Sequence, residues 1–113
     1  MDIFSPVKLG RLQLDNRVVM APMTRSRADA GHMPNALMAE YYRQRAGAGM
    51  IVSEGIAPSA NGVGYCRTPG IYNPQQTRAW RDVVSGVHGA GGLIVAQLMH
   101  CGRIGHPLNK PAD

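Results

Sequence analysis

Hydrophobic residues occur along the chain in two kinds of segment. Three short runs, at residues 17–22, 50–53 and 93–98, are almost continuously apolar and rich in β-branched side chains. Runs of this kind are typical of strands buried on both faces of a parallel sheet. We therefore predict three strands, the first ending at Pro22 and the second at Glu54 and Gly55.

Two amphipathic segments separate the predicted strands. The first extends from Asn35 to Arg45, and its apolar side chains fall on one helical face. These side chains are Leu37, Met38, Tyr41 and Tyr42. The second has Asn73 as N-cap, Pro74 at the first helical position and Gln76 three residues past the cap. Its apolar face consists of Trp80, Val83, Val84 and Val87. Both segments are predicted to be helices. The first ends at Gly47 and Gly49, and the second ends at the glycine-rich segment 89–92.

The order of these elements predicts an α/β fold. Residues 1–16 form a hairpin around Gly10, residues 17–98 hold three strands and two helices, and residues 99–113 begin a loop. Strands that alternate with helices favour a parallel sheet with right-handed crossovers. A complete (β/α)8 TIM barrel needs about 250 residues. The chain is therefore expected to be one partial TIM-barrel domain, an N-terminal portion with about three of the eight strands.

A partial barrel leaves apolar surface exposed. All three predicted strands are apolar on both faces, whereas two helices cover only one face of the sheet. The other face and two sheet edges are open to pairing with further chain. We expect the chain to be ordered only beside a complementing polypeptide or within a longer one, with the break in the loop after the third strand.

Composition excludes several classes of protein. The chain is 44% apolar and 17% charged, and its net charge of +5 is spread over scattered residues. Neither Arg25 with Arg27 nor Arg43 with Arg45 has the interleaved aromatics that stack on bases, so no nucleic-acid partner is expected. The two cysteines lack metal-site spacing, and no apolar run is long enough to cross a bilayer. These features predict a cytoplasmic protein without a metal or membrane partner.

The chemistry of a parallel sheet gathers at the carboxyl ends of its strands. Those ends are residues 21–24, 53–55 and 97–103. Together with residues 41–46, they carry four segments that resemble, in order, the opening motifs of the Old Yellow Enzyme family of flavin-dependent ene-reductases, which includes N-ethylmaleimide reductase-like enzymes. The segments are APMTR at 21–25, YYRQRA at 41–46, SEG at 53–55 and QLMHCGR at 97–103.

This resemblance implies that FMN lies at the mouth of a barrel. The FMN would take hydride from NAD(P)H and pass it to an activated alkene such as an enone. The implied FMN-binding residues are Pro22, Met23, Thr24, Gly55 and Gln97. The Thr24 hydroxyl would donate to the flavin C4 carbonyl, and the backbone N–H of Gly55, where the family often has Ala, would approach the same edge. The Gln97 amide would match the pyrimidine N3–H and carbonyls.

Three further residues take supporting parts in the resemblance. Tyr65 would bind substrate, His100 would support the site from behind, and Arg103 would anchor the loop. Taken singly, Thr24 is more often a turn hydroxyl, Gln97 a solvated or satisfied amide, and His100 a structural residue. For Tyr65, packing over a helix is nearly as common as substrate binding.

The family's catalytic groups come from later strands. These are the substrate-activating pair, usually two His or His and Asn, and the proton-donating Tyr. The Arg beside flavin N1 and the phosphate-binding loops, which hold the cofactor, also come from later strands. We therefore expect no catalytic residue in this chain, no stable FMN binding by the chain alone and no turnover.

Two other enzyme classes fit the sequence less well. An aldolase or isomerase of the same scaffold would need a strand-end Lys, but Lys8 and Lys110 lie elsewhere. A dinucleotide fingerprint follows a strand, whereas the glycines at 47–49 and 89–92 precede strands. A non-catalytic half-barrel that associates with another chain remains open as the alternative.

Overall fold

The computed structural model describes residues 1–112, and Asp113, the last residue of the predicted loop, lies outside the described residues. A small antiparallel hairpin joins β1 (Val7–Leu9) to β2 (Leu12–Leu14). The elements that follow alternate as β3 (Val19–Met20), α1 (Ala36–Arg43), β4 (Met50–Ile56), α2 (Pro74–Gly89) and β5 (Ile94–Leu98). Three single-turn 3-10 helices, η1 (Ala60–Gly62), η2 (Gly102–Ile104) and η3 (Pro107–Asn109), lie in the connecting loops.

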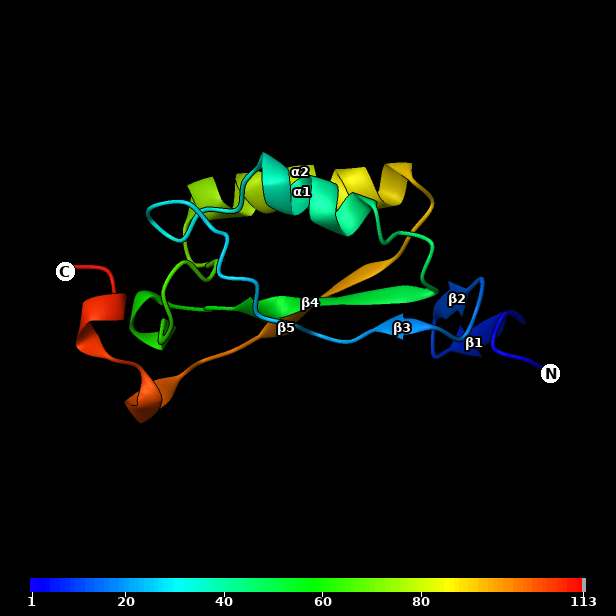
Figure 1. The fold of residues 1–113 in the computed structure, drawn as a ribbon, viewed down its shortest axis with the longest axis horizontal. Coiled ribbons are helices and arrows are strands. Elements are labelled where there is room, and N and C mark those ends of the chain that lie inside the picture. Colours follow the sequence, from blue (N-terminus) through cyan, green and yellow to red (C-terminus); the bar gives the residue numbers. More distant parts are fainter. Residues whose placement is uncertain (113) are drawn as a thin grey trace.

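The predicted parallel sheet is confirmed. Its strands lie in the order β3-β4-β5, and both pairs are parallel. Helices α1 and α2 lie side by side on one face, and no helix covers the opposite face in the part of the chain that the structure describes (Figure 1). The result is an α/β layer with the element order of a barrel segment.

The core lies between the sheet and the two helices. Met20, Ile51 and Ile94 are direct neighbours across the three strands, and all three pack into this core. Tyr42 of α1 and Trp80 of α2 meet them there, with 0% and 5% of their surface exposed. The buried Trp80 indole donates a hydrogen bond of 3.0 Å to the Gly70 carbonyl, which satisfies its polar edge.

Both helices begin where the sequence predicts. The side-chain oxygen of Asn35 accepts a hydrogen bond from the Met38 N–H, and that of Asn73 accepts one from the Gln76 N–H at 2.8 Å. The end of α1 and the width of its apolar face were predicted wrongly. The helix ends at Arg43, before the glycines, and Leu37 is 62% exposed because it lies at the edge of the buried face.

Two strand lengths also differ from the prediction. Strand β3 has two residues instead of six, because it pairs only with the beginning of β4, through Val19 and Met20. Strand β4 continues past Glu54 and Gly55, where it was predicted to end, to Ile56, and η1 lies in the loop that follows. The prediction that the strands are apolar throughout is wrong for β4, which buries Ser53 and Glu54.

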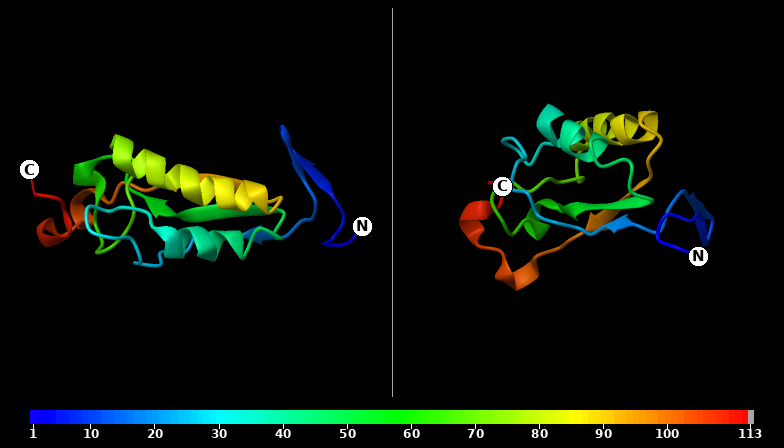
Figure 2. Two further views of the ribbon diagram at one scale, coloured as in Figure 1. Left: turned by 90° about the horizontal axis from the view of Figure 1, so that it is seen from above. Right: turned by 45° about the vertical axis from the view of Figure 1, so that its right-hand side comes forward.

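The two ends of the sheet differ in character. The hairpin lies beyond the amino ends of the strands, whereas the loops at 57–72 and 99–112 gather at the carboxyl ends (Figures 1 and 2). Apolar side chains remain exposed on the sheet, including Val19 at 45% and Leu98 at 62%.

Within residues 1–112, no helix has the length and apolar content to cross a membrane.

The Asn73 cap gives a direct test of the start of α2. Replacing Asn73 with Ala removes the acceptor of the Gln76 N–H, so the free energy of unfolding should fall by about 1 kcal/mol. The exposed neighbour Gln75→Ala is the matched control and should change it little. Urea denaturation followed by Trp80 fluorescence measures both, and equal stabilities of the two variants would contradict the assignment of the cap.

Candidate functional site

A bulge in β4 shapes the carboxyl end of the sheet. Val52 pairs with Val95, but the next pair along is Gly55 with Gln97, so β4 uses one residue more than β5 between the two pairs. The bulge also explains the core: Ile51 and Ile56 are five positions apart, yet both are buried among the helices. In a regular strand, an odd spacing would place them on opposite faces.

Two buried hydroxyl groups satisfy the backbone around the bulge. The Ser53 hydroxyl accepts a 3.1 Å hydrogen bond from the Gln97 N–H and donates one of 2.8 Å to the Glu54 carbonyl. The Tyr42 hydroxyl accepts from the Glu54 N–H and donates to Glu54 Oε2, both at 2.8 Å. Buried polar groups left without partners are costly, so these four bonds stabilise the irregular strand.

Glu54 is a buried carboxyl group with an incomplete set of partners. Only 1% of its surface is exposed, and its Oε1 has no hydrogen-bond partner among the described residues. Burial raises the pKa of Glu54 above 4.5, against the lowering effects of the Tyr42 hydroxyl and of Arg25. Burial also raises the pKa of Tyr42 well above 10, so its hydroxyl stays protonated.

Gly55 and Gln97, two of the residues predicted to bind flavin, lie next to each other on β4 and β5. Gly55 is buried because the Met99 side chain lies against it. A β-carbon built on Gly55 would come within 2.6 Å of Met99 Cε and 2.8 Å of its Sδ. Gln97 is exposed, and no described residue uses its side-chain amide.

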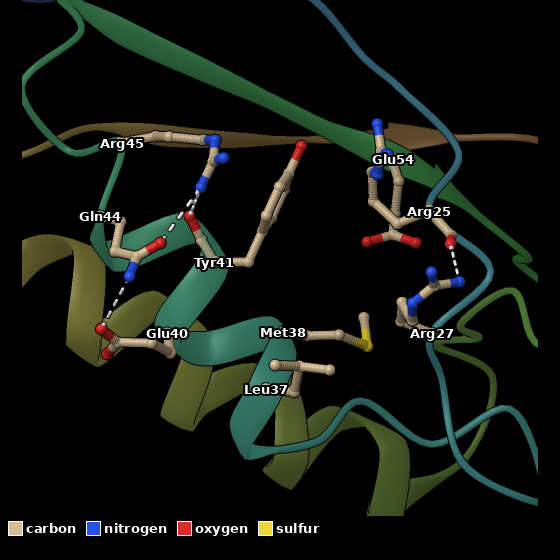
Figure 3. Close-up of a pocket in the computed structure, with 9 residues that line it drawn as sticks. All are labelled: Arg25, Arg27, Leu37, Met38, Glu40, Tyr41, Gln44, Arg45 and Glu54. Carbon is tan, nitrogen blue, oxygen red and sulfur yellow. Dashed lines mark hydrogen bonds between the residues drawn. The ribbon is translucent and has the colours of Figure 1, made fainter.

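The segment after β3 runs exposed along the same end of the sheet. Pro22, Met23 and Thr24 are all exposed, and no described residue bonds to the Thr24 hydroxyl. Arg25, the next residue, lies beside the Glu54 carboxyl of β4, as the close-up shows (Figure 3). The chain therefore passes from Thr24 directly to the bulge.

The other predicted residues lie in the loops at this end. Tyr65 is 46% exposed, and the His100 ring packs against Gly62. Arg103 is exposed in η2 and was expected to anchor the loop. The observed ties are elsewhere: Lys110 Nζ donates to the Asn61 carbonyl at 2.7 Å, and the Cys101 N–H donates to the Gly62 carbonyl at 2.9 Å.

A groove of about 300 Å³ lies near the bulge but on the side of α1 (Figure 3). Its lining includes Glu54, Arg25 and Tyr41, and the Arg45 guanidinium lies 3.9 Å from the centre of the Tyr41 ring. None of the residues predicted to contact flavin lines this groove. The strand-end surface and the groove are therefore different places.

The strand-end surface fits one edge of a flavin. It combines an unused amide on Gln97 and an unused hydroxyl on Thr24 with exposed apolar atoms of Met23. A flat heteroaromatic ring with alternating donors and acceptors needs this mixture of polar and apolar contacts. Within residues 1–112, no cluster of three His, Cys, Asp or Glu side chains could hold a metal ion.

Sequence reasoning missed the groups that support this surface. Tyr42 was assigned to the apolar face of a helix, and Ser53 and Glu54 to the end of a strand. The available signal was the odd spacing of Ile51 and Ile56 around two polar residues. That spacing fits one buried face only if a bulge lies between them.

The contact between Gly55 and Met99 can be tested by adding one methyl group. In Gly55→Ala the new β-carbon would overlap Met99, so this side chain should turn aside at a cost of about 1 kcal/mol. The methyl resonance of Met99 in a methionine-labelled sample should move. Gly89→Ala, where a β-carbon meets nothing within 4 Å, is the control. An unmoved Met99 resonance in Gly55→Ala would contradict the observed packing.

The buried Glu54 predicts a pH dependence of stability. Because its pKa is higher in the folded chain than in the unfolded one, its contribution is fully present below about pH 4.5 and is lost as the pH rises through the folded pKa. Glu54→Gln should remove this loss, so that unfolding free energy falls less between pH 5 and 8 than in the unmodified chain.

Glu40→Gln is the control for this experiment. Glu40 is exposed, and its hydrogen bond with Arg43 lowers its pKa, so the substitution should leave the fall above pH 5 in place. Urea denaturation at a series of pH values measures all three proteins. Parallel pH profiles for the unmodified chain and Glu54→Gln would show that Glu54 is not the group responsible.

The sequence of this chain is similar to those of known reductases. The chain is 47% identical over 110 residues to 12-oxophytodienoate reductase 7 of Oryza sativa subsp. japonica, covering 96% of this chain and 28% of the reductase. It is 43% identical to a chanoclavine-I aldehyde reductase of Penicillium roqueforti, covering 98% of this chain and 31% of that protein.

Solved structures agree with the sequence comparison. Morphinone reductase in complex with tetrahydroNAD superimposes with a TM-score of 0.92 at 48% identity, covering 96% of this chain and 30% of that one. An old yellow enzyme homologue from Zymomonas mobilis gives a TM-score of 0.88 at 48% identity, covering 91% of this chain and 29% of that one. The chain thus spans about 30% of the length of these relatives.

The family-level comparison agrees with both. The model of the NADH:flavin oxidoreductase / NADH oxidase family matches residues 2–110, and FMN is the cofactor of this family. The resemblance to the Old Yellow Enzyme family is thereby confirmed. The chain therefore belongs to the NADH:flavin oxidoreductase / NADH oxidase family, whose model covers nearly its whole length.

Proposed function

We propose that this chain is the N-terminal part of a flavin-dependent NAD(P)H oxidoreductase that reduces activated alkenes such as enones. The observation that carries the proposal is the pairing of Gly55 with Gln97 at the carboxyl end of the sheet. This pairing places a side-chain amide and a residue without a side chain together on the surface where parallel barrels bind their ligands.

In this proposal each surface residue holds one part of the cofactor. Gln97 offers both a donor and an acceptor to the pyrimidine edge, and the Thr24 hydroxyl offers a donor to its carbonyl. Pro22 and Met23 supply backbone and apolar contact beside the ring, and Gly55 allows close approach. Tyr65, half exposed in the neighbouring loop, faces the substrate side.

FMN supplies the hydride chemistry when it is bound. The residues of this chain bind and orient the ring, and donors on its carbonyl favour the electron-rich reduced form. NAD(P)H as reductant is supported by the tetrahydroNAD complex of morphinone reductase. An activated alkene as substrate is inferred from the family resemblance of the strand-end segments.

The proposal includes a complementing part of the barrel as partner. The sheet face opposite the helices carries exposed Val19, and β3 and β5 are edge strands, with Leu98 of β5 also exposed. Burying this surface requires further strands beside both edges. The same exposed surface supports the alternative that the chain associates with another polypeptide without catalysis.

One experiment separates these two functions. The chain is co-expressed with the part of morphinone reductase that the chain does not match, and the purified complex is titrated with FMN. We expect visible flavin absorbance in the complex, NADPH oxidation that depends on an added enone, and neither property in the chain alone. If an assembled complex retains no flavin absorbance after incubation with excess FMN and removal of the unbound FMN, only the non-catalytic association remains as an explanation.

A variant at Gln97 shows whether this chain holds the cofactor. Gln97→Leu removes the amide without adding bulk, so FMN should bind about tenfold more weakly, the effect of losing one net hydrogen bond. Gln75→Leu on the exposed side of α2 is the control. Equal FMN affinities in the two complexes would contradict the assignment of Gln97.

A further inference from the structure

We infer that Tyr42 and Ser53 are positioning residues for the cofactor edge: their hydroxyls hold the β4 bulge that puts Gly55 opposite Gln97. Neither residue is exposed at the strand-end surface, and both would act only through the backbone. The inference rests on the function proposed above, because it concerns the orientation of the same surface.

The register shows what the bulge does. Val52 pairs with Val95, so without the extra residue Ser53 would pair with Ala96 and Glu54 with Gln97. A shift of one residue moves each side chain to the other face of a sheet. Glutamate would then stand beside Gln97 where the bulged strand has Gly55. The bulge therefore decides which residue meets the amide of Gln97.

The two hydroxyls bind the backbone groups at this irregularity from two different elements, α1 and β4. Tyr42 reaches Glu54 from α1 and accepts its N–H, while Ser53 accepts the N–H of Gln97 from the neighbouring strand β5. Each hydroxyl also donates to Glu54, one to its side chain and one to its carbonyl. Glu54 is thus held by α1 through Tyr42 and by its own strand through Ser53.

Both hydroxyls are buried away from the strand-end surface. Tyr42 has 0% and Ser53 has 1% of its surface exposed, so neither can touch a ligand bound there. Removing either hydroxyl frees one amide of the bulge without altering any group on that surface. Tyr42→Phe frees the N–H of Glu54, and Ser53→Ala frees that of Gln97.

The test uses the complex of the chain with its complement. Amide hydrogen exchange is measured first, without FMN. We expect the Glu54 amide in Tyr42→Phe, and the Gln97 amide in Ser53→Ala, to exchange about tenfold faster or more, as the loss of one net hydrogen bond implies. Tyr41→Phe and Ser85→Ala are the controls, since no described residue bonds to either hydroxyl.

The midpoint potential of bound FMN is the readout that a merely structural role would leave unchanged. If the bulge aligns donors with the flavin carbonyl, each variant should weaken binding of reduced relative to oxidised FMN about tenfold, which lowers the potential by about 30 mV. The controls should keep the potential of the unmodified complex. Two variants at different elements keep the test decisive if one of them fails to fold.

Three other outcomes would overturn the inference, and the measurements distinguish each of them from the others. Unchanged exchange at both amides would show that the hydroxyls do not hold the bulge. Faster exchange with an unchanged potential would show that the bulge does not position the cofactor. A complex that shows protected amides but binds no FMN would overturn the proposed function, and the inference with it.

Discussion

One extra residue in β4 determines what the sheet presents at its carboxyl end. The strand must satisfy two demands: Ile51 and Ile56 both belong in the core beneath the helices, and Gly55 must lie beside Gln97. A regular strand meets only one of them, because its side chains alternate between faces. The bulge at Ser53 and Glu54 meets both, and two buried hydroxyls satisfy the backbone groups that it leaves irregular.

The packed core and the proposed flavin-binding surface lie in different parts of the fold. The helix-facing layer of Met20, Ile51 and Ile94 is apolar and buried against α1 and α2. The polar groups at the carboxyl ends lie outside that layer, so they can change without opening the core. Glu54 is the exception, because its buried carboxyl group is bonded to the core residue Tyr42, and its protonation is coupled to stability.

Much of the fold could be predicted because its signals are local. The N-caps at Asn35 and Asn73 act within three residues, and the alternation of strands and helices is visible from periodicity alone. The bulge leaves one trace in this pattern, the odd spacing of Ile51 and Ile56, but its hydrogen-bond partners leave none. Its partners Tyr42 and Gln97 are 12 and 44 residues from the groups they bind, and hydrophobic pattern carries no information on such pairs.

The candidate site was also predicted in part: the residues at the strand ends were located, but the groups that support them were not. Family resemblance located Thr24, Gly55 and Gln97 on the correct end of the sheet, although their contacts with flavin remain a prediction. It did not locate the supporting hydroxyls, because their hydrogen-bond partners lie on other elements or depend on the bulge, and neither is visible in the sequence pattern. Leu37 illustrates the opposite error, since periodicity gives the direction of a buried face but not its width.

The central claim is that Gln97 and its strand-end neighbours form one edge of a flavin site. The most direct measurement is the nuclear magnetic resonance signal of the Gln97 side-chain amide in the assembled barrel, recorded with and without FMN. The account predicts that this signal and the Gly55 backbone signal shift on FMN addition, while the Gln75 amide does not. FMN binding that leaves both signals in place would contradict it.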